Sequence, residues 1–161
     1  MNRRQILLAA WASSLVLPAL AASETPLDIV TQIYRVSAGK KGDYAGESAF
    51  SDKAIRASFF SRGFLAAVVK MEKKSASTNE PILDFDPVTA SQDPSVKRLK
   101  IGTESAGADS GIVTATFYSF DNKQPTLVRY LFIMEAGQWK LDDIEGDVEG
   151  DKWSVRAITR N

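Results

Sequence analysis

Residues 126–145, TLVRYLFIMEAGQWKLDDIE, decide the fold. Two runs rich in apolar, β-branched and aromatic residues, 126–135 and 138–145, flank an Ala136-Gly137 pair that is typical of a tight turn. This spacing predicts an antiparallel hairpin of two strands. The first run is apolar on both faces of the expected strand, which predicts a central strand that is covered on each side.

Further strands are expected around this hairpin. Residues 111–120, GIVTATFYSF, alternate in hydropathy and predict a strand. Residues 96–102, VKRLKIG, alternate weakly and fit an outer strand, whose open side Lys97 and Lys100 would guard. The other segments of this half are expected to be irregular or short, with loops at 103–110 and 146–152 and a short turn or helix at 153–159.

Helical periodicity precedes the strands and does not alternate with them. Residues 27–37 and 52–74 both carry apolar side chains at helical spacing. Thr25 is expected to cap the first helix, and Gly39 is expected to end it. The side chains expected on the apolar face of the second helix are Ile55, Phe59, Phe60, Phe64, Ala66, Val68, Val69 and Met71. Helices first and strands last predict an α+β domain with an antiparallel sheet.

The composition excludes several kinds of site. The chain of 161 residues contains no Cys and no His, which makes a structural zinc, a haem, an iron–sulfur cluster or a Ser-His-Asp triad implausible. Its 20 basic and 20 acidic side chains balance, which argues against binding to nucleic acid or to an anionic membrane. We therefore expect no cofactor, no bound metal and no nucleic-acid partner.

The first 22 residues, MNRRQILLAAWASSLVLPALAA, have the pattern of a cleavable export signal. Arg3 and Arg4 form a positive n-region, residues 6–17 form an apolar core, and residues 19–21 form a small-x-small cleavage site. The apolar core is shorter than the about 20 residues that span a bilayer. We expect a periplasmic or secreted bacterial protein with no stable membrane anchor after cleavage and one domain at 23–161. The arginine pair partly matches a twin-arginine signal, and the general secretory and twin-arginine routes both stay open.

Three stretches carry a resemblance to a known family. Residues 130–144, YLFIMEAGQWKLDDI, resemble the last hairpin of nuclear-transport-factor-2-like domains, in which a Gly turn precedes a Trp-containing strand. Residues 83–87, LDFDP, followed by Gln92-Asp93, and residues 153–158, WSVRAI, extend the resemblance to an uncharacterised family of exported bacterial proteins in that superfamily. The resemblance implies a cone in which N-terminal helices pack on a curved sheet around an internal pocket. It implies no activity.

Asp84, Asp86, Gln92 and Asp93 form the strongest polar constellation. Oxygen ligands this close in sequence could bind Ca²⁺ or Mg²⁺, but Val88 stands where a calcium loop has its third ligand. We favour turn capping, because Asp side chains in turns routinely accept hydrogen bonds from nearby amides. The alternative is that these four side chains face a ligand.

The internal pocket of a cone would form a second constellation. The side chains expected to line it are Tyr34, Phe60, Phe64, Tyr118, Arg129, Tyr130 and Trp139. An apolar cavity can raise the pKa of a carboxyl group toward neutrality, so Asp142 as base and Tyr118 as proton donor could serve an isomerase or a lyase. We favour an ordinary aromatic core. Arg156 is expected to pair with Asp142, Asp143 or Glu145 in a structural contact at the sheet edge.

The expected function is binding without catalysis. The bound partner would be a small apolar molecule in the cone or another protein on the open face of the sheet. The resemblance also implies a homodimer through that face. Two alternatives remain: a carboxylate- and Tyr-based isomerase or lyase, and an inhibitor or immunity protein against an exported toxin or enzyme. A cone filled by its own side chains, beside an exposed patch of several hundred Å², would favour the protein-binding classes over the enzyme.

Overall fold

The computed structural model describes residues 24–120, 123–148 and 150–160, and the export signal predicted at residues 1–22 lies outside them. The described elements are α1 (Pro26–Ala38), α2 (Lys53–Phe59), α3 (Arg62–Thr78), β1 (Lys97–Ala106), β2 (Ser110–Tyr118), β3 (Thr126–Glu135), β4 (Gln138–Val148), β5 (Asp151–Ser154) and α4 (Val155–Ile158). The strands form one curved antiparallel sheet in the order β1-β2-β3-β4-β5. This confirms the predicted α+β class.

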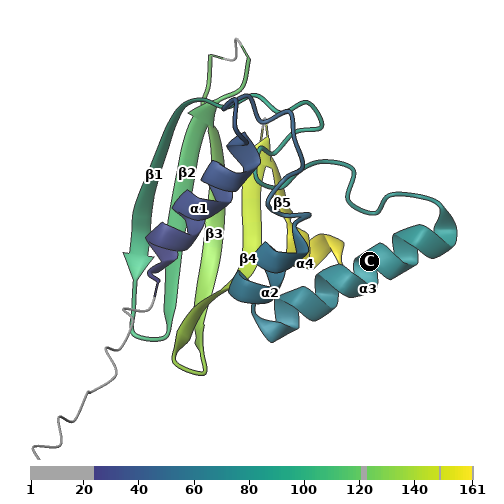
Figure 1. Cartoon of the computed structure of the whole chain (residues 1–161), viewed down its shortest axis with the longest axis vertical. Coiled ribbons are helices and arrows are strands. Elements are labelled where there is room, and N and C mark those ends of the chain that lie inside the picture. The colour runs from purple at the N-terminus through teal and green to yellow at the C-terminus, as the bar shows by residue number, and fades with distance from the viewer. Residues whose placement is uncertain (1–23, 121–122, 149, 161) are drawn as a thin grey trace, which may run out of the picture.

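Helix α1 lies across one face of the sheet (Figure 1) and confirms the helix predicted at residues 27–37. Thr25 caps it in a capping box: its hydroxyl accepts from the Asp28 amide at 3.2 Å, and the Asp28 carboxylate accepts from the Thr25 amide at 3.1 Å. Gly39 follows the last turn with a φ of 62°, a conformation that favours glycine. The buried side chains of α1 are Ile29, Val30, Ile33, Tyr34 and Ser37.

The single helix predicted at 52–74 is wrong, because the structure breaks it at Phe60 and Ser61 into α2 and α3. Phe60 is extended and forms an isolated parallel bridge with Leu141 of β4, and the Ser61 amide donates to the Leu141 carbonyl at 2.8 Å. The Ser61 hydroxyl then caps α3 by accepting from the Phe64 amide at 3.0 Å. A tertiary contact with the sheet therefore overrides the helical periodicity.

Helix α3 leaves part of its predicted apolar face in solvent. Phe64, Val68 and Met71 are buried as expected, whereas Ala66 and Val69 are exposed. The buried three recur at i, i+4 and i+7 and so share one side of the helix, whereas Ala66 lies on another. In Figure 1 the C-terminal half of α3 extends outward beyond the sheet. The chain then returns toward the sheet through residues 79–96, which carry no helix or strand of their own.

Strand β3 has the predicted bounds, but the expectation that it is covered on each side is wrong. Val128, Tyr130 and Phe132 are buried on the face under α1. On the opposite face Leu127 is 39% exposed, and Leu131 is only half-buried. The sheet is therefore packed on one face and partly open on the other, a common arrangement for antiparallel sheets.

The sheet also extends beyond the predicted strands at both ends. Strand β1 continues through the expected loop at 103–110 as far as Ala106. Strand β4 continues to Val148, and β5 pairs with Glu145–Val148, so most of the loop expected at 146–152 is a second hairpin. Long strands of a continuous meander offer backbone partners to short polar segments such as β5, whose composition does not predict a strand.

Candidate binding groove

The space expected to form a cone pocket is filled by the side chains of the protein. Tyr34 from α1 meets the rings of Phe117 and Tyr130 edge to face, each with 6.1 Å between ring centroids. Phe60 and Phe64 stack at 4.7 Å, and all five aromatic side chains are buried. These aromatic residues therefore form a core.

Two of the residues predicted to line that pocket lie on the opposite face of the sheet. The Arg129 guanidinium pairs there with Glu104, which lowers the pKa of Glu104 and raises that of Arg129. The Tyr118 ring lies under the Arg98 guanidinium, 5.7 Å from it. The prediction that Tyr118 and Arg129 point into the cone is wrong, because the alternation of β2 and β3 turns them outward.

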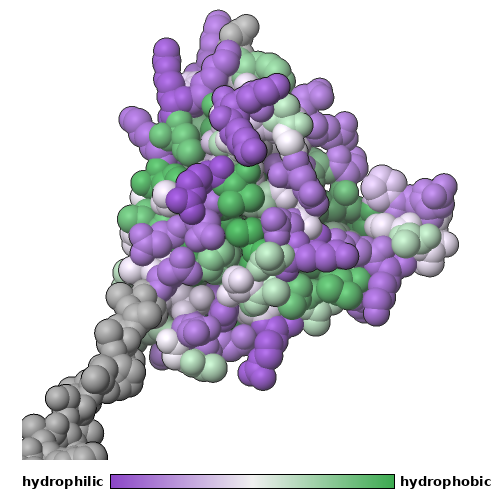
Figure 2. Space-filling view, viewed as in Figure 1, coloured by the Kyte–Doolittle hydropathy of each residue, from purple (hydrophilic) through white to green (hydrophobic). Residues whose placement is uncertain are grey.

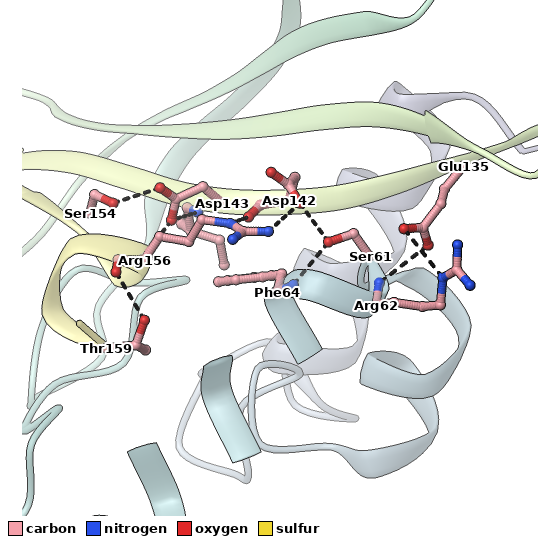
Figure 3. Close-up of polar contacts among 10 residues, drawn as sticks. Ser61, Arg62, Phe64, Glu135, Asp142, Asp143, Ser154, Arg156 and Thr159 are labelled. Atoms are coloured by element: carbon pink, nitrogen blue, oxygen red, sulfur yellow. Dashed lines mark hydrogen bonds and ion pairs between the residues drawn. The ribbon is translucent and has the colours of Figure 1, made fainter. Parts of the chain in front are cut away.

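Asp142 is also separated from Tyr118: it stands at a β-bulge in β4 and has structural partners there (Figure 3). Its carboxylate accepts from the Ser61 hydroxyl at 2.5 Å and pairs with the Arg156 guanidinium. The predicted contact of Arg156 with Asp142 is confirmed. The strand register places Tyr118 two strands away from Asp142 and about six residues further along the sheet. The two side chains are therefore roughly 20 Å apart.

Asp143 completes this structural network at the free edge of β4 (Figure 3). Its carboxylate accepts from the Ser154 hydroxyl at 2.5 Å and from the Arg156 amide at 3.0 Å. The Arg156 side chain also donates to the Asp142 carbonyl at 2.5 Å. These contacts lie along the part of β4 that β5 does not reach, and they join α4 and α3 to the sheet.

An open groove of about 790 Å³ lies between α3 and the segment that returns from it, and we name it the α3 groove. The residues that line it are Ser48, Phe50, Ser51, Arg56, Met71, Glu72, Ser75, Pro81, Leu83, Asp84, Phe85, Asp86, Pro87 and Gln92. Figure 2 shows apolar surface interrupted by polar side chains on the side of the molecule that carries α3. The groove combines apolar walls with charged groups, as ligand sites commonly do.

Arg56 of α2 is the buried charged group of the groove, with only 7% of the residue exposed. Its guanidinium donates to the carbonyls of Phe50 and Ser51 at 2.6 and 3.0 Å, and to the Glu72 carboxylate at 2.6 Å. Glu72 lies on α3 and its side chain is 48% exposed. Arg56 therefore joins the loop before α2 to α3, and its charge is matched at the site.

The structure brings three of the predicted polar residues to the groove and leaves the fourth outside. Asp86 accepts from Ser48, from the Val88 amide and from Thr89, at 2.6, 3.0 and 3.1 Å, which confirms turn capping. Asp84 is exposed, and its carboxylate accepts from the side-chain amide of Gln92 at 3.4 Å. Asp93 makes its hydrogen bonds through its backbone and does not line the groove.

A second pocket of about 420 Å³ lies on the other side of the same segment. Asp84, Phe85 and Gln92 line both pockets, and Trp153 of β5 lines the second one. Phe85 meets Trp153 edge to face at 4.9 Å. The segment is therefore held against β5 by an aromatic contact, and Phe85 is its central apolar side chain.

Sequence reasoning missed Arg56, Glu72 and Ser75 as members of the groove. Arg56 carried a usable signal: it stands three and four residues before Phe59 and Phe60, on the face of the helical pattern that should be apolar. Glu72 and Ser75 carried none, because only the break between α2 and α3 brings them beside Arg56 and the returning segment.

Within the described ranges, no group of three acidic side chains gathers as a metal site would require. None of the helices in the described part of the chain has the length and apolar character that crossing a bilayer demands. No family model matches this chain, and no curated protein or solved structure does. The resemblance to nuclear-transport-factor-2-like domains therefore stays a prediction.

Proposed function

We propose that this chain is an exported binding domain and that it holds its ligand in the α3 groove. The observation that carries the proposal is the contrast between two places. The interior under α1 is filled by Tyr34, Phe117 and Tyr130, whereas the groove beside α3 is open. A small ligand in the cone would have to displace core aromatic side chains, at a cost of several kcal/mol for each ring.

The groove has the size and composition that suit a small molecule. Its volume of about 790 Å³ lies in the usual range of small-molecule sites, about 300–1,000 Å³. Leu83 and Phe85, which are half-buried, offer apolar surface, and the buried Arg56 holds two elements in place around it. Export rests on the signal pattern at residues 1–22.

The geometry gives no support to the isomerase or lyase alternative. Asp142 is engaged by Ser61 and Arg156, and Tyr118 lies on the outward face of the sheet. In the groove, the oxygens of Asp86 are taken up by the three donors of its turn. A catalytic base must reach a substrate proton, and Asp142, the predicted base, is not placed for that.

The proposal is tested with protein purified under mild conditions from a bacterial periplasm. Native mass spectrometry of the wild type should show a bound small molecule. Ser51→Trp, which places an indole in the groove, should lose that mass, because Ser51 is exposed and lines the groove. Ser105→Trp, at an exposed position of β1, is the matched control and should keep it. A wild type without any bound mass, or a Ser51→Trp variant that keeps the mass, would contradict the proposal.

A further inference from the structure

We propose that the α3 groove selects a ligand with a positively charged nitrogen on an apolar body. The inference rests on the proposed function and names the ligand class of that same site. It is carried by the charges on the two walls of the groove and by the apolar side chains between them.

The groove carries an excess of negative charge. The charged residues that line it are one base, Arg56, and three acids, Glu72, Asp84 and Asp86. Glu72 neutralises the Arg56 guanidinium at 2.6 Å, and the carbonyls of Phe50 and Ser51 accept its other hydrogen bonds. Among the residues that line the groove, the carboxylates of Asp84 and Asp86 therefore have no basic partner. A cleft lined by one sign of charge attracts ligands of the other sign.

The carboxylates of Asp84 and Asp86 differ in what they can offer to a ligand. Ser48, Val88 and Thr89 take up most of the acceptor capacity of the Asp86 carboxylate, so Asp86 contributes mainly its field. Asp84 is exposed, and its long contact with Gln92 leaves acceptor capacity at the mouth of the groove. Asp84 is therefore the residue that we expect to bond the cationic nitrogen.

The apolar part of the ligand has surface to cover. Met71 of α3 faces the returning segment, whose Leu83 and Phe85 are half-buried. The Phe85 ring packs against Trp153, and this contact holds it as an apolar wall next to Asp84. Covering such surface supplies affinity, and the adjacent carboxylate supplies the preference for a cation.

An anionic ligand fits the same groove poorly. Its natural partner would be Arg56, whose side chain is 8% exposed and already bonded to Glu72. An anion would have to displace Glu72 and would then lie near Asp84 and Asp86. Like charges that are brought together without a counterion oppose binding.

Three six-carbon probes separate charge from apolar contact: hexylamine, hexanol and hexanoate. Hexylamine and hexanol have the same alkyl body, hexanoate counts its carboxylate carbon among the six, and the heads are positive, neutral and negative at pH 7. Binding to the mature protein is followed by ¹H–¹⁵N chemical shifts at 0.15 M salt. We expect hexylamine to bind about fivefold more tightly than hexanol, which corresponds to one favourable exposed charge pair, and hexanoate to bind most weakly.

Two charge-neutral substitutions locate the effect. Asp84→Asn should bring the affinity for hexylamine down to that for hexanol and leave hexanol unchanged. Asp93→Asn makes the same charge change in the same segment but outside the groove, and it should alter hexylamine affinity less than twofold. The proposal would be overturned if hexanoate bound as tightly as hexylamine or if both substitutions had an equal effect. It would also be overturned if hexylamine did not bind at about 10 mM, roughly the weakest binding that matters for a site.

The groove-filling variant separates this inference from the proposed function. Loss of all three probes in Ser51→Trp, with hexanoate the tightest in the wild type, would leave the groove as the site and remove the cation preference. Unchanged hexylamine binding in Ser51→Trp would remove both. Asp84 is exposed and makes one long hydrogen bond, so Asp84→Asn should fold normally, and its urea midpoint checks this.

Discussion

The concave face of the sheet and the α3 groove are both built on aromatic side chains, and they differ in what covers them. Helix α1 crosses the sheet and inserts Tyr34 between Phe117 and Tyr130. Helix α3 starts at the sheet edge and runs outward past it, so its second half forms a wall and not a cover (Figure 1). The first place is a core because an amphipathic helix lies flat on it. The second stays open because the helix and its returning segment diverge.

The polar contacts follow the same division. Under α1, the Tyr34 hydroxyl makes one buried bond, to the Val88 carbonyl at 2.8 Å. Around the groove, the bonds of Arg56, Glu72 and Asp86 join separate pieces of backbone instead of filling space. Packing should therefore dominate stability in the first region, and exposed charge should matter for binding in the second.

The largest expected contrast is between two Phe→Ala substitutions. Phe64 has no exposed surface and stacks on Phe60, so Phe64→Ala should cost about 3–5 kcal/mol in the free energy of unfolding. Phe85 is half-buried in the groove, and Phe85→Ala should cost only about 1–2 kcal/mol while it weakens hexylamine binding. Urea unfolding measures both. Equal losses would show that the groove side chains are as much a part of the core as Phe64.

The position of the Trp153 indole, which packs against Phe85, depends on a glycine. A Cβ at Gly146 would lie 2.3 Å from Cζ2 of Trp153, whose indole is already in contact with Phe85. Gly146→Ala should therefore destabilise the protein by about 1–3 kcal/mol in thermal or urea unfolding. Gly102→Ala in β1 is the matched control, since a Cβ there meets nothing within 4 Å. A Gly146→Ala variant as stable as Gly102→Ala would mean that Trp153 can move aside freely.

The parts of the fold that were predictable are those with local causes. The hairpin of residues 126–145 follows from composition and an Ala136-Gly137 turn, and α1 follows from its cap and periodicity. The break at Phe60 was not predictable from periodicity, since Phe60 and Phe64 keep helical spacing and the cause is a bridge to distant Leu141.

The candidate site divides in the same way. Asp84, Asp86 and Gln92 were singled out because they lie close together in the chain, and the groove collects them. Arg56 and Glu72 come from two helices that the sequence presents as one. A single helix over 52–74 would separate them by 16 residues, roughly 24 Å along its axis, so the contact at 2.6 Å exists only because the helix breaks.

A smaller effect, of opposite signs, is expected from two tyrosine hydroxyls in the closed region. The buried Tyr130 hydroxyl makes no hydrogen bond of ordinary geometry in the described structure and has only a weak contact with the Tyr34 hydroxyl, so Tyr130→Phe should stabilise the protein by about 1 kcal/mol. Tyr34→Phe removes the bond to Val88 and leaves that carbonyl buried without a donor, so it should cost about 1–2 kcal/mol. Urea midpoints that move in the same direction for both variants would contradict this assignment.

The smallest effect concerns the cap that positions α1 over the closed face. The hydroxyl and the amide of Thr25 donate to Asp28, and these bonds lower the pKa of that carboxyl below its ordinary value. A carboxyl whose pKa is lower in the folded protein stabilises it above the ordinary pKa, and the contribution is lost as pH falls through the lowered value. Thr25→Ala removes the hydroxyl, so NMR titration should find the pKa of Asp28 closer to ordinary, and the stability difference from wild type should shrink in acid. An unchanged pKa would mean that the Thr25 amide alone holds the carboxylate, and that the hydroxyl acts only as a cap for the Asp28 amide.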